Sequence, residues 1–222
     1  MTRAARLCTL GLVLACAVSP ALAQLSASAS IMSDYRYRGI SLSGAAAAYN
    51  IALNYDSAWG GYAGVALTKA RMRYTEVDAQ KLAYAGYAHR LGPATSWDIG
   101  VTDTRYSGSD RYNYCELHAG VSGERFSARI YTAARYSGVG TRSVYAEING
   151  SHPLSDSVDL VGHIGYLVKP EARADLRIGL SAALDAWTVQ LAWVAAREEA
   201  PLYPALYTNR ASRAVLSLTR GF

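Results

Sequence analysis

The sequence has few charges, few lysines and no long apolar run in its main part. Only 18% of the 222 residues are charged, and 3 Lys stand against 19 Arg. So few charges beside 51% hydrophobic residues exclude general disorder, and soluble globular proteins usually carry about a quarter charged residues. Beyond the N-terminal segment, no apolar run reaches the roughly 18 residues of a spanning helix. A helical membrane protein is therefore excluded, whereas a β-barrel is not.

Cysteine is also scarce, with Cys8, Cys16 and Cys115 as its three positions. The first two lie in the N-terminal segment, so Cys115 stands alone, and neither a disulfide framework nor a zinc-binding spacing is present. The four histidines are scattered along the chain. We therefore predict no metal, no cofactor and no catalytic residue.

The N-terminus predicts a secretory signal peptide over residues 1–23, followed by a single barrel domain over 24–222. Arg3 and Arg6 form a basic region, an apolar stretch of signal-peptide length follows, and Ala21-Leu22-Ala23 matches a cleavage site. An alternative remains open, because Leu14-Ala15-Cys16 resembles a lipobox whose Cys16 would be lipidated. Cleavage after Ala23 would leave 20 basic against 17 acidic residues, a net charge of +3. This balance does not favour nucleic-acid binding.

Apolar and polar residues alternate through most of the remaining chain. In residues 47–56 the odd positions are apolar or aromatic, while Asn50, Asn54 and Asp56 fall on the other face. Period-two alternation indicates β-strands with one apolar face. We predict an all-β, antiparallel, up-and-down transmembrane barrel of about 12 strands, with a range of 10–14. The predicted strands are 27–39, 46–56, 61–70, 80–90, 96–106, 111–122, 126–136, 142–152, 158–168, 174–183, 187–196 and 212–222.

The links and the last residue agree with a membrane barrel. From the second strand on, short links tend to alternate with longer or more charged ones, as between the two sides of outer-membrane barrels. The chain ends in Phe222 after alternating apolar positions, which resembles the signal read by the barrel assembly machinery. A soluble β-sandwich is the alternative, but its strands tolerate a charged outer face, and here the faces opposite the charges are apolar.

Several motifs resemble a family of proteobacterial outer-membrane proteins, the porins of the TorF type, long catalogued as conserved proteins of unknown function. The most specific is Ser33-Asp34-Tyr35-Arg36-Tyr37-Arg38-Gly39-Ile40-Ser41, and others are Trp97-Asp98-Ile99-Gly100 and Tyr145-Ala146-Glu147-Ile148-Asn149-Gly150. The resemblance covers nearly the whole chain after the signal peptide. Residues 45–48 are all alanine, where this family tends to place Pro and Gln, so the shape of the first loop stays open. The resemblance implies a barrel with a pore, and no solute or catalytic residue.

The alternation also predicts which side chains line the lumen and which face lipid. Asp34, Arg36 and Arg38 should stack on one face of the first strand, either for selectivity or in structural ion pairs. The excess of tyrosine, 17 against 2 Phe, is expected to mark the barrel rims. The predicted aromatic girdle is Tyr35, Tyr37, Trp187 and Trp193. The predicted lumen-lining residues are Asp34, Arg36, Arg38, Asp98, Glu116, His118, Arg129, Arg135, Glu147, Asp159, His163, Arg177 and Arg213.

The sequence therefore favours an outer-membrane porin of a Gram-negative bacterium, with passive diffusion of small polar solutes. Its expected partners are outer-membrane lipid, small solutes and, through the C-terminal strand, the assembly machinery. One alternative is a closed structural or sensory barrel, because a 12-stranded barrel lies between filled and open sizes. An outer-membrane lipid hydrolase is the less favoured alternative. His118 would face the lumen, His152 and the adjacent Ser151 would point to opposite faces, and His89 and His163 have no obvious serine partner.

Overall fold

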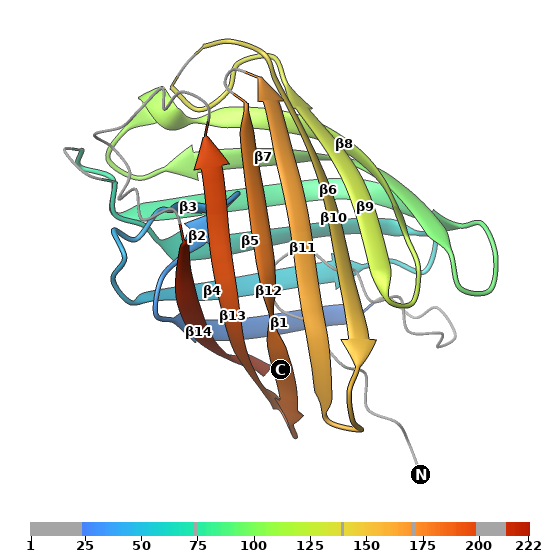
Figure 1. Ribbon diagram of the computed structural model, residues 1–222. Coiled ribbons are helices and arrows are strands. Elements are labelled where there is room, and N and C mark those ends of the chain that lie inside the picture. The colour runs from blue at the N-terminus through green and yellow to red at the C-terminus, as the bar shows by residue number, and fades with distance from the viewer. Residues whose placement is uncertain (1–23, 73–74, 139, 170–171, 199–211) are drawn as a thin grey trace.

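The computed structural model describes residues 24–72, 75–138, 140–169, 172–198 and 212–222, so the predicted signal peptide lies outside the described residues. The chain forms a closed antiparallel barrel in which each strand pairs with its neighbours in sequence order and β14 returns to β1 (Figure 1). Its twelve strands are β1 (Gln24–Met32), β4 (Ala48–Asp56), β5 (Gly61–Lys69), β6 (Ala79–Arg90), β7 (Ser96–Tyr106), β8 (Tyr114–Ser122), β9 (Phe126–Ala133), β10 (Ser143–Pro153), β11 (Val158–Lys169), β12 (Arg173–Leu184), β13 (Trp187–Glu198) and β14 (Ser212–Gly221).

The outer face of the barrel is apolar and the inner face is polar. On β12, Leu176, Ile178 and Leu180 are each about half exposed, whereas Asp175 and Ser181 on the other face are buried. This is the reverse of a soluble protein, in which large apolar side chains are buried. The predicted 12-stranded barrel is confirmed. Among the described residues, no helix is long and apolar enough to cross a membrane.

The two ends of the barrel differ. At the end we call the terminal end, β1 begins and β14 finishes, joined by reciprocal backbone hydrogen bonds between Ala27 and Phe222. Its links are tight, such as residues 57–60 between β4 and β5. At the opposite end, here called the loop end, lie residues 33–47, 70–72, 75–78, 107–113, 134–138 and 140–142. Residues 107–113 contain the 3-10 helix η1 (Asp110–Tyr112).

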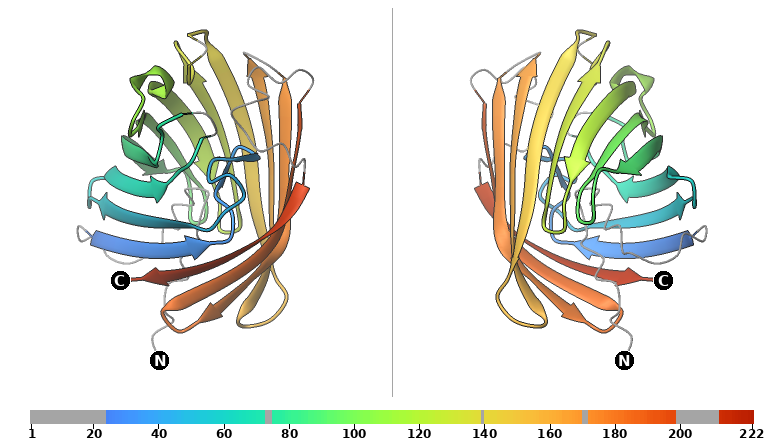
Figure 2. Two further views of the ribbon diagram at one scale, coloured as in Figure 1. Left: turned by 90° about the vertical axis from the view of Figure 1, so that its left-hand side faces the viewer. Right: turned by 90° about the vertical axis from the view of Figure 1, so that its right-hand side faces the viewer.

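The first strand differs from the prediction, because it ends at Met32 instead of continuing to Gly39. The chain then leaves the wall and forms a small hairpin inside the barrel, with β2 (Arg36–Tyr37) paired to β3 (Ile40–Ser41) (Figure 2). We call residues 33–46 the inner hairpin. Arg38 and Gly39 at its tip have φ angles of 49° and 78°, the combination that a tight two-residue hairpin turn requires.

The tip of the inner hairpin lies against β13 and β12, two and three strands from β1 around the barrel. A Cβ atom on Gly39 would lie 2.6 Å from the Cβ of Ala196 on β13 and 2.7 Å from the Cβ of Asp175 on β12. At its return, Arg213 on β14 donates a hydrogen bond of 2.9 Å to the carbonyl oxygen of Ala45. The hairpin therefore leaves β1, contacts β12 and β13 at its tip, and is tied to β14 just before β4 begins.

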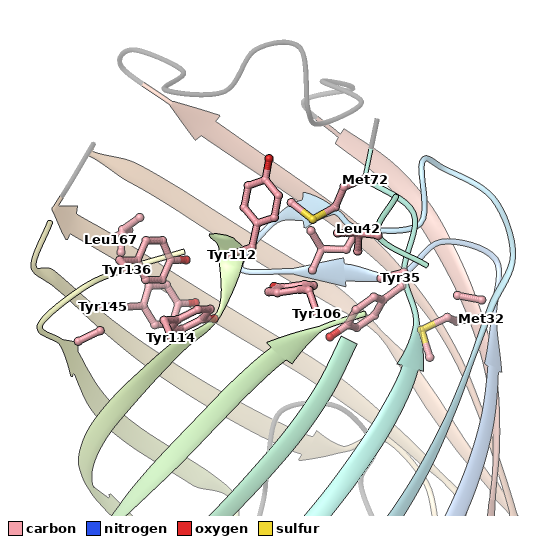
Figure 3. Packing of buried hydrophobic residues seen from close by; sticks show 14 residues of the cluster. Met32, Tyr35, Leu42, Met72, Tyr106, Tyr112, Tyr114, Tyr136, Tyr145 and Leu167 are labelled. Atoms are coloured by element: carbon pink, nitrogen blue, oxygen red, sulfur yellow. The ribbon is translucent and has the colours of Figure 1, made fainter. Parts of the chain in front are cut away.

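Apolar and aromatic side chains pack around the hairpin at the loop end (Figure 3). Tyr35 and Leu42 from the hairpin are 4% and 3% exposed. Burial of each such side chain contributes about 1.5–3 kcal/mol. This mouth cluster comprises Met32, Tyr35, Leu42, Ala48, Ala70, Met72, Val77, Tyr106, Tyr112, Tyr114, Ala133, Tyr136, Tyr145 and Leu167.

Candidate functional site: the charged lumen and its inner hairpin

An ion pair joins the hairpin tip to the barrel wall. Both terminal nitrogens of Arg38 donate to the Glu116 carboxylate on β8, at 2.9 and 2.8 Å. The two side chains are 4% and 1% exposed. A bidentate arginine–carboxylate pair fixes geometry as well as charge, because both groups are planar. The pair therefore holds the hairpin in one position.

Asp34 organises the hairpin itself. Its carboxylate accepts hydrogen bonds from the Ser41 hydroxyl at 2.5 Å and the Arg36 Nε at 2.9 Å, and Ser43 lies at 3.0 Å. Arg36 also donates to the carbonyl oxygen of Gly39 at 3.0 Å. The Tyr35 hydroxyl donates to Gln80 on β6, and burial raises the pKa of Tyr35, so this hydroxyl stays protonated in the physiological pH range.

A second polar network lies on β5 to β9. Asp98 accepts hydrogen bonds from the Arg129 guanidinium at 3.1–3.2 Å and from the Tyr62 hydroxyl at 3.2 Å. His118 contacts the same carboxylate at 3.4 Å and the Tyr62 hydroxyl at 2.9 Å. The charges of Asp98 and Arg129 therefore compensate each other against the wall, as buried charges must.

A third network lies on β10 to β12. His163 contacts Asp175 at 2.7 Å through Nε2 and the Asn149 amide oxygen at 2.8 Å through Nδ1. The Tyr145 hydroxyl donates to Asp175 at 3.1 Å, and Asn149 donates to Glu147 at 3.4 Å. The network therefore links three neighbouring strands.

Inward-facing glycines give these large side chains room to lie along the wall. A Cβ on Gly165 would overlap the Tyr145 hydroxyl and lie 2.7 Å from Asp175 Oδ2, so Tyr145 crosses β11 over this glycine to reach β12. On β8, a Cβ on Gly120 would overlap Cγ of Arg129, which crosses β8 towards Asp98 in the same way. Tyr145 and Arg129 are thereby kept close to the wall.

Comparison with known proteins places the chain in a family. A family model matches residues 15–222, and its description is "Bacterial protein of unknown function (Gcw_chp)". The chain belongs to this family. Comparison with curated protein sequences finds no match. The family model carries no TorF name, so that finer assignment stays a prediction.

Solved structures share the fold of this Gcw_chp barrel. It is similar to a structure described as "KdgM porin", with a TM-score of 0.56 and 10% identity over 90% of this chain and 99% of that chain. The KdgM porin in complex with disordered oligogalacturonate gives a TM-score of 0.54 and 8% identity over the same shares. Pseudomonas aeruginosa OprD matches with a TM-score of 0.43 and 9% identity, over 80% of this chain and 61% of that chain. At these identities, the two KdgM structures show the fold alone.

Most predicted lumen residues of this Gcw_chp barrel lie on the inner face of the wall, and three lie on the inner hairpin. Asp34, Arg36 and Arg38 are inside the barrel, but on the hairpin and not stacked along the first strand. Arg135 differs from the prediction, because it is exposed in the segment after β9, where strand alternation no longer applies. The predicted residues on inward strand faces are Asp98, Glu116, His118, Arg129, Glu147, Asp159, His163, Arg177 and Arg213.

The prediction of an aromatic girdle was wrong for Tyr35 and Tyr37. Tyr35 is buried in the mouth cluster and Tyr37 packs against it, because both belong to the inner hairpin. Trp187 and Trp193 are on the outer face, 41% and 50% exposed, but Trp193 lies opposite Ile178 near the middle of its strand and not at a rim. Phe222 is exposed beside Arg220, whose guanidinium lies 5.1 Å from the centre of its ring.

The interpretation of the tyrosine excess as a rim signal was also wrong in the main. Of the 14 tyrosines that the structure describes, eight are buried, namely Tyr35, Tyr62, Tyr84, Tyr106, Tyr112, Tyr114, Tyr136 and Tyr145. The prediction also missed Tyr145 and Asp175 as site residues. A sequence signal for them exists, because Tyr145 lies two positions before Glu147 and Asp175 two before Arg177, on the same strand faces.

Proposed function

We propose that the protein is an outer-membrane porin through which small polar solutes diffuse passively, with the inner hairpin controlling passage at the loop end. The observation that carries this proposal is the closed barrel itself, apolar on its outside and lined inside by paired charges. An apolar outer face matches lipid, while a polar lumen matches water and polar solutes. The fold shared with the KdgM porin supports the same conclusion.

The lumen supplies fixed charges of both signs. Arg38 and Glu116 compensate each other, as do Arg129 and Asp98. Paired charges orient a polar or zwitterionic solute without strongly favouring one sign of ion. We therefore expect weak ion selectivity and a preference for small neutral or zwitterionic solutes.

Planar-bilayer recording tests the proposal directly. The folded, purified barrel should give discrete conductance steps, and vesicles containing it should swell in small sugars faster than in large ones. A barrel that is folded by circular dichroism and heat-modifiable on gels, yet silent in the bilayer, contradicts passive diffusion through the wild-type protein.

A second candidate function, a closed structural or sensory barrel, is favoured by one observation. The inner hairpin and the mouth cluster pack across the lumen at the loop end, with Tyr145 and Leu167 at 1% and 0% exposed. Deleting residues 36–41 separates the candidates. Conductance only in the deletion variant indicates a closed barrel, whereas conductance in both proteins, larger in the variant, indicates a porin narrowed by the hairpin.

We also propose that the outer face binds outer-membrane lipid and that the C-terminal strand is read by the barrel assembly machinery. Phe222 is 68% exposed and follows outward-facing Leu216 and Leu218, which supports this. Replacing Phe222 by Ala should lower the amount of folded barrel in the outer membrane, whereas Phe222→Tyr should retain it. Equal yields for both variants would remove Phe222 from the signal.

A further inference from the structure

The guanidinium of Arg38 lies in a cage of aromatic rings closed by a carboxylate. The nearest ring is that of Tyr145, with its centre 4.1 Å from Arg38 Cζ. Three further tyrosine rings lie within 6 Å, those of Tyr37 at 5.1 Å, Tyr131 at 5.2 Å and Tyr136 at 5.8 Å. Aromatic rings attract cations over their faces, and cages of this kind recognise organic cations. The Glu116 carboxylate completes the site with two hydrogen bonds.

Tyr131, Tyr145 and Glu116 of the cage come from wall strands and Tyr136 from the segment after β9, and the three rings have partners other than Arg38. Tyr131 donates a hydrogen bond to Glu147 at 3.2 Å, and Tyr145 is held by Asp175. Tyr136 packs against Tyr114, with ring centres 4.9 Å apart. Of the four rings, only that of Tyr37 belongs to the hairpin. The three rings would therefore stay in place if the hairpin moved away, and Glu116 would remain on β8 beside them.

The hairpin that carries Arg38 owes its shape to side-chain hydrogen bonds around Asp34 and little to backbone pairing. Each of its strands has two residues, so its own backbone ladder is minimal. Arg38 also has a φ angle of 49°, in the left-handed region that costs a non-glycine residue free energy. The hairpin is thus held mainly by what its side chains contact on the wall.

From these three observations we infer that the Tyr131, Tyr136, Tyr145 and Glu116 cage is a binding site for the guanidinium group of a solute, which Arg38 occupies as a tethered ligand. A free guanidinium compound competes with Arg38 and releases the hairpin. The planar fork of a guanidinium matches the bidentate carboxylate and stacks on the rings, which a compact ammonium ion does not. The release of solute flow that follows rests on the proposed porin function, whereas occupation of the cage does not.

Hydrogen exchange of the hairpin amides tests the site without requiring conductance. The Leu42 amide donates to the Tyr35 carbonyl and the Tyr35 amide donates to Ser43 Oγ, both within the hairpin, while the Arg71 amide outside it donates to the Leu42 carbonyl. When the hairpin leaves, the Arg71 bond breaks and the other two amides lose the shielding of the wall, so all three exchange faster. In the wild-type protein, ethylguanidinium should accelerate this exchange about tenfold by mass action when its concentration is ten times its Kd for the cage that Arg38 has left. Ethylammonium at the same concentration should have little effect.

The Arg38→Ala variant should respond with the opposite sign. Its cage is empty and its hairpin docks weakly, because Glu116 has lost its counter-ion. Ethylguanidinium in the cage compensates Glu116 and contacts Tyr37 of the hairpin, so it favours docking and slows the exchange of the same amides. Arg105→Ala is the matched control, because Arg105 pairs with Asp103 at 2.8 Å on the exposed outer face, and this variant should behave as the wild type. A wild-type protein that responds equally to ethylguanidinium and ethylammonium, or to neither, overturns the inference. If Arg38→Ala does not fold, this comparison of the two cations in the wild-type protein decides the question alone.

Bilayer recording then separates this inference from the proposed function. Ethylguanidinium, and not ethylammonium, should raise the open probability of the wild-type channel. Exchange that responds as expected in a protein that is silent in every bilayer condition supports the site and contradicts the porin. If the wild-type protein conducts but neither its conductance nor its hydrogen exchange changes with ethylguanidinium, the porin function is supported and the guanidinium site is overturned.

Discussion

Removing Arg38 should free the inner hairpin while leaving the barrel folded. The guanidinium and the Glu116 carboxylate are 4% and 1% exposed. Loss of one partner of a buried ion pair costs about 3–5 kcal/mol, because the other charge remains without compensation. The hairpin can move away and let water reach Glu116, so this cost should fall on hairpin docking and not on the twelve-stranded ladder. At about 1.4 kcal/mol for each factor of ten, docking should weaken roughly 100-fold or more.

Amide hydrogen exchange followed by mass spectrometry measures this change. Peptides that cover residues 33–46 should exchange roughly 100-fold faster in Arg38→Ala and in Glu116→Gln, while peptides from β11 to β13 should be unchanged. The double variant should lose less docking free energy than the two single variants lose together, because it leaves no unpaired charge. The exposed Arg105–Asp103 pair has the same 2.8 Å separation, and its loss should cost at most about 1 kcal/mol. If the exchange rate of the hairpin peptides in Arg38→Ala stays within fivefold of the wild-type rate, the Arg38–Glu116 ion pair does not hold the hairpin in place.

Three further predictions concern the wall. Gly165→Ala should displace Tyr145 and lower the urea midpoint of barrel unfolding, whereas Gly162→Ala on the same strand, with no atom within 4 Å of its added Cβ, should leave the midpoint nearly unchanged. Ile178→Arg places a charge near the middle of the lipid-facing surface and should cost about 2–4 kcal/mol in vesicles, against less than about 1.5 kcal/mol for Ile178→Leu. Arg129→Gln leaves the Asp98 carboxylate uncompensated and should shift the reversal potential in a salt gradient towards cation selectivity, and an unchanged potential would place this pair outside the ion path.

The sequence alone predicted the barrel, its strand number and the boundaries of most strands. The signal was local, since alternation with a period of two identifies a strand and its two faces from the strand's own residues. Antiparallel neighbours joined by short links then have only one simple way to close, so β4 to β14 followed from the pattern. The inward placement of Asp98, Glu116 and Arg129 came from the same alternation.

Only the tertiary structure decided what the first predicted strand does after Met32. Residues 33–39 alternate like a strand, but Arg38 and Gly39 adopt positive φ angles, and the chain turns inward because Glu116, 78 residues away, takes up the Arg38 charge. Likewise, most of the described tyrosines, which composition suggested for the rims, lie inside the barrel. The hydroxyls of Tyr62 and Tyr145, for example, donate hydrogen bonds to carboxylates on other strands. The residues of a strand determine its apolar and polar faces, whereas the contacts across a lumen depend on which distant strands the closed barrel brings opposite one another.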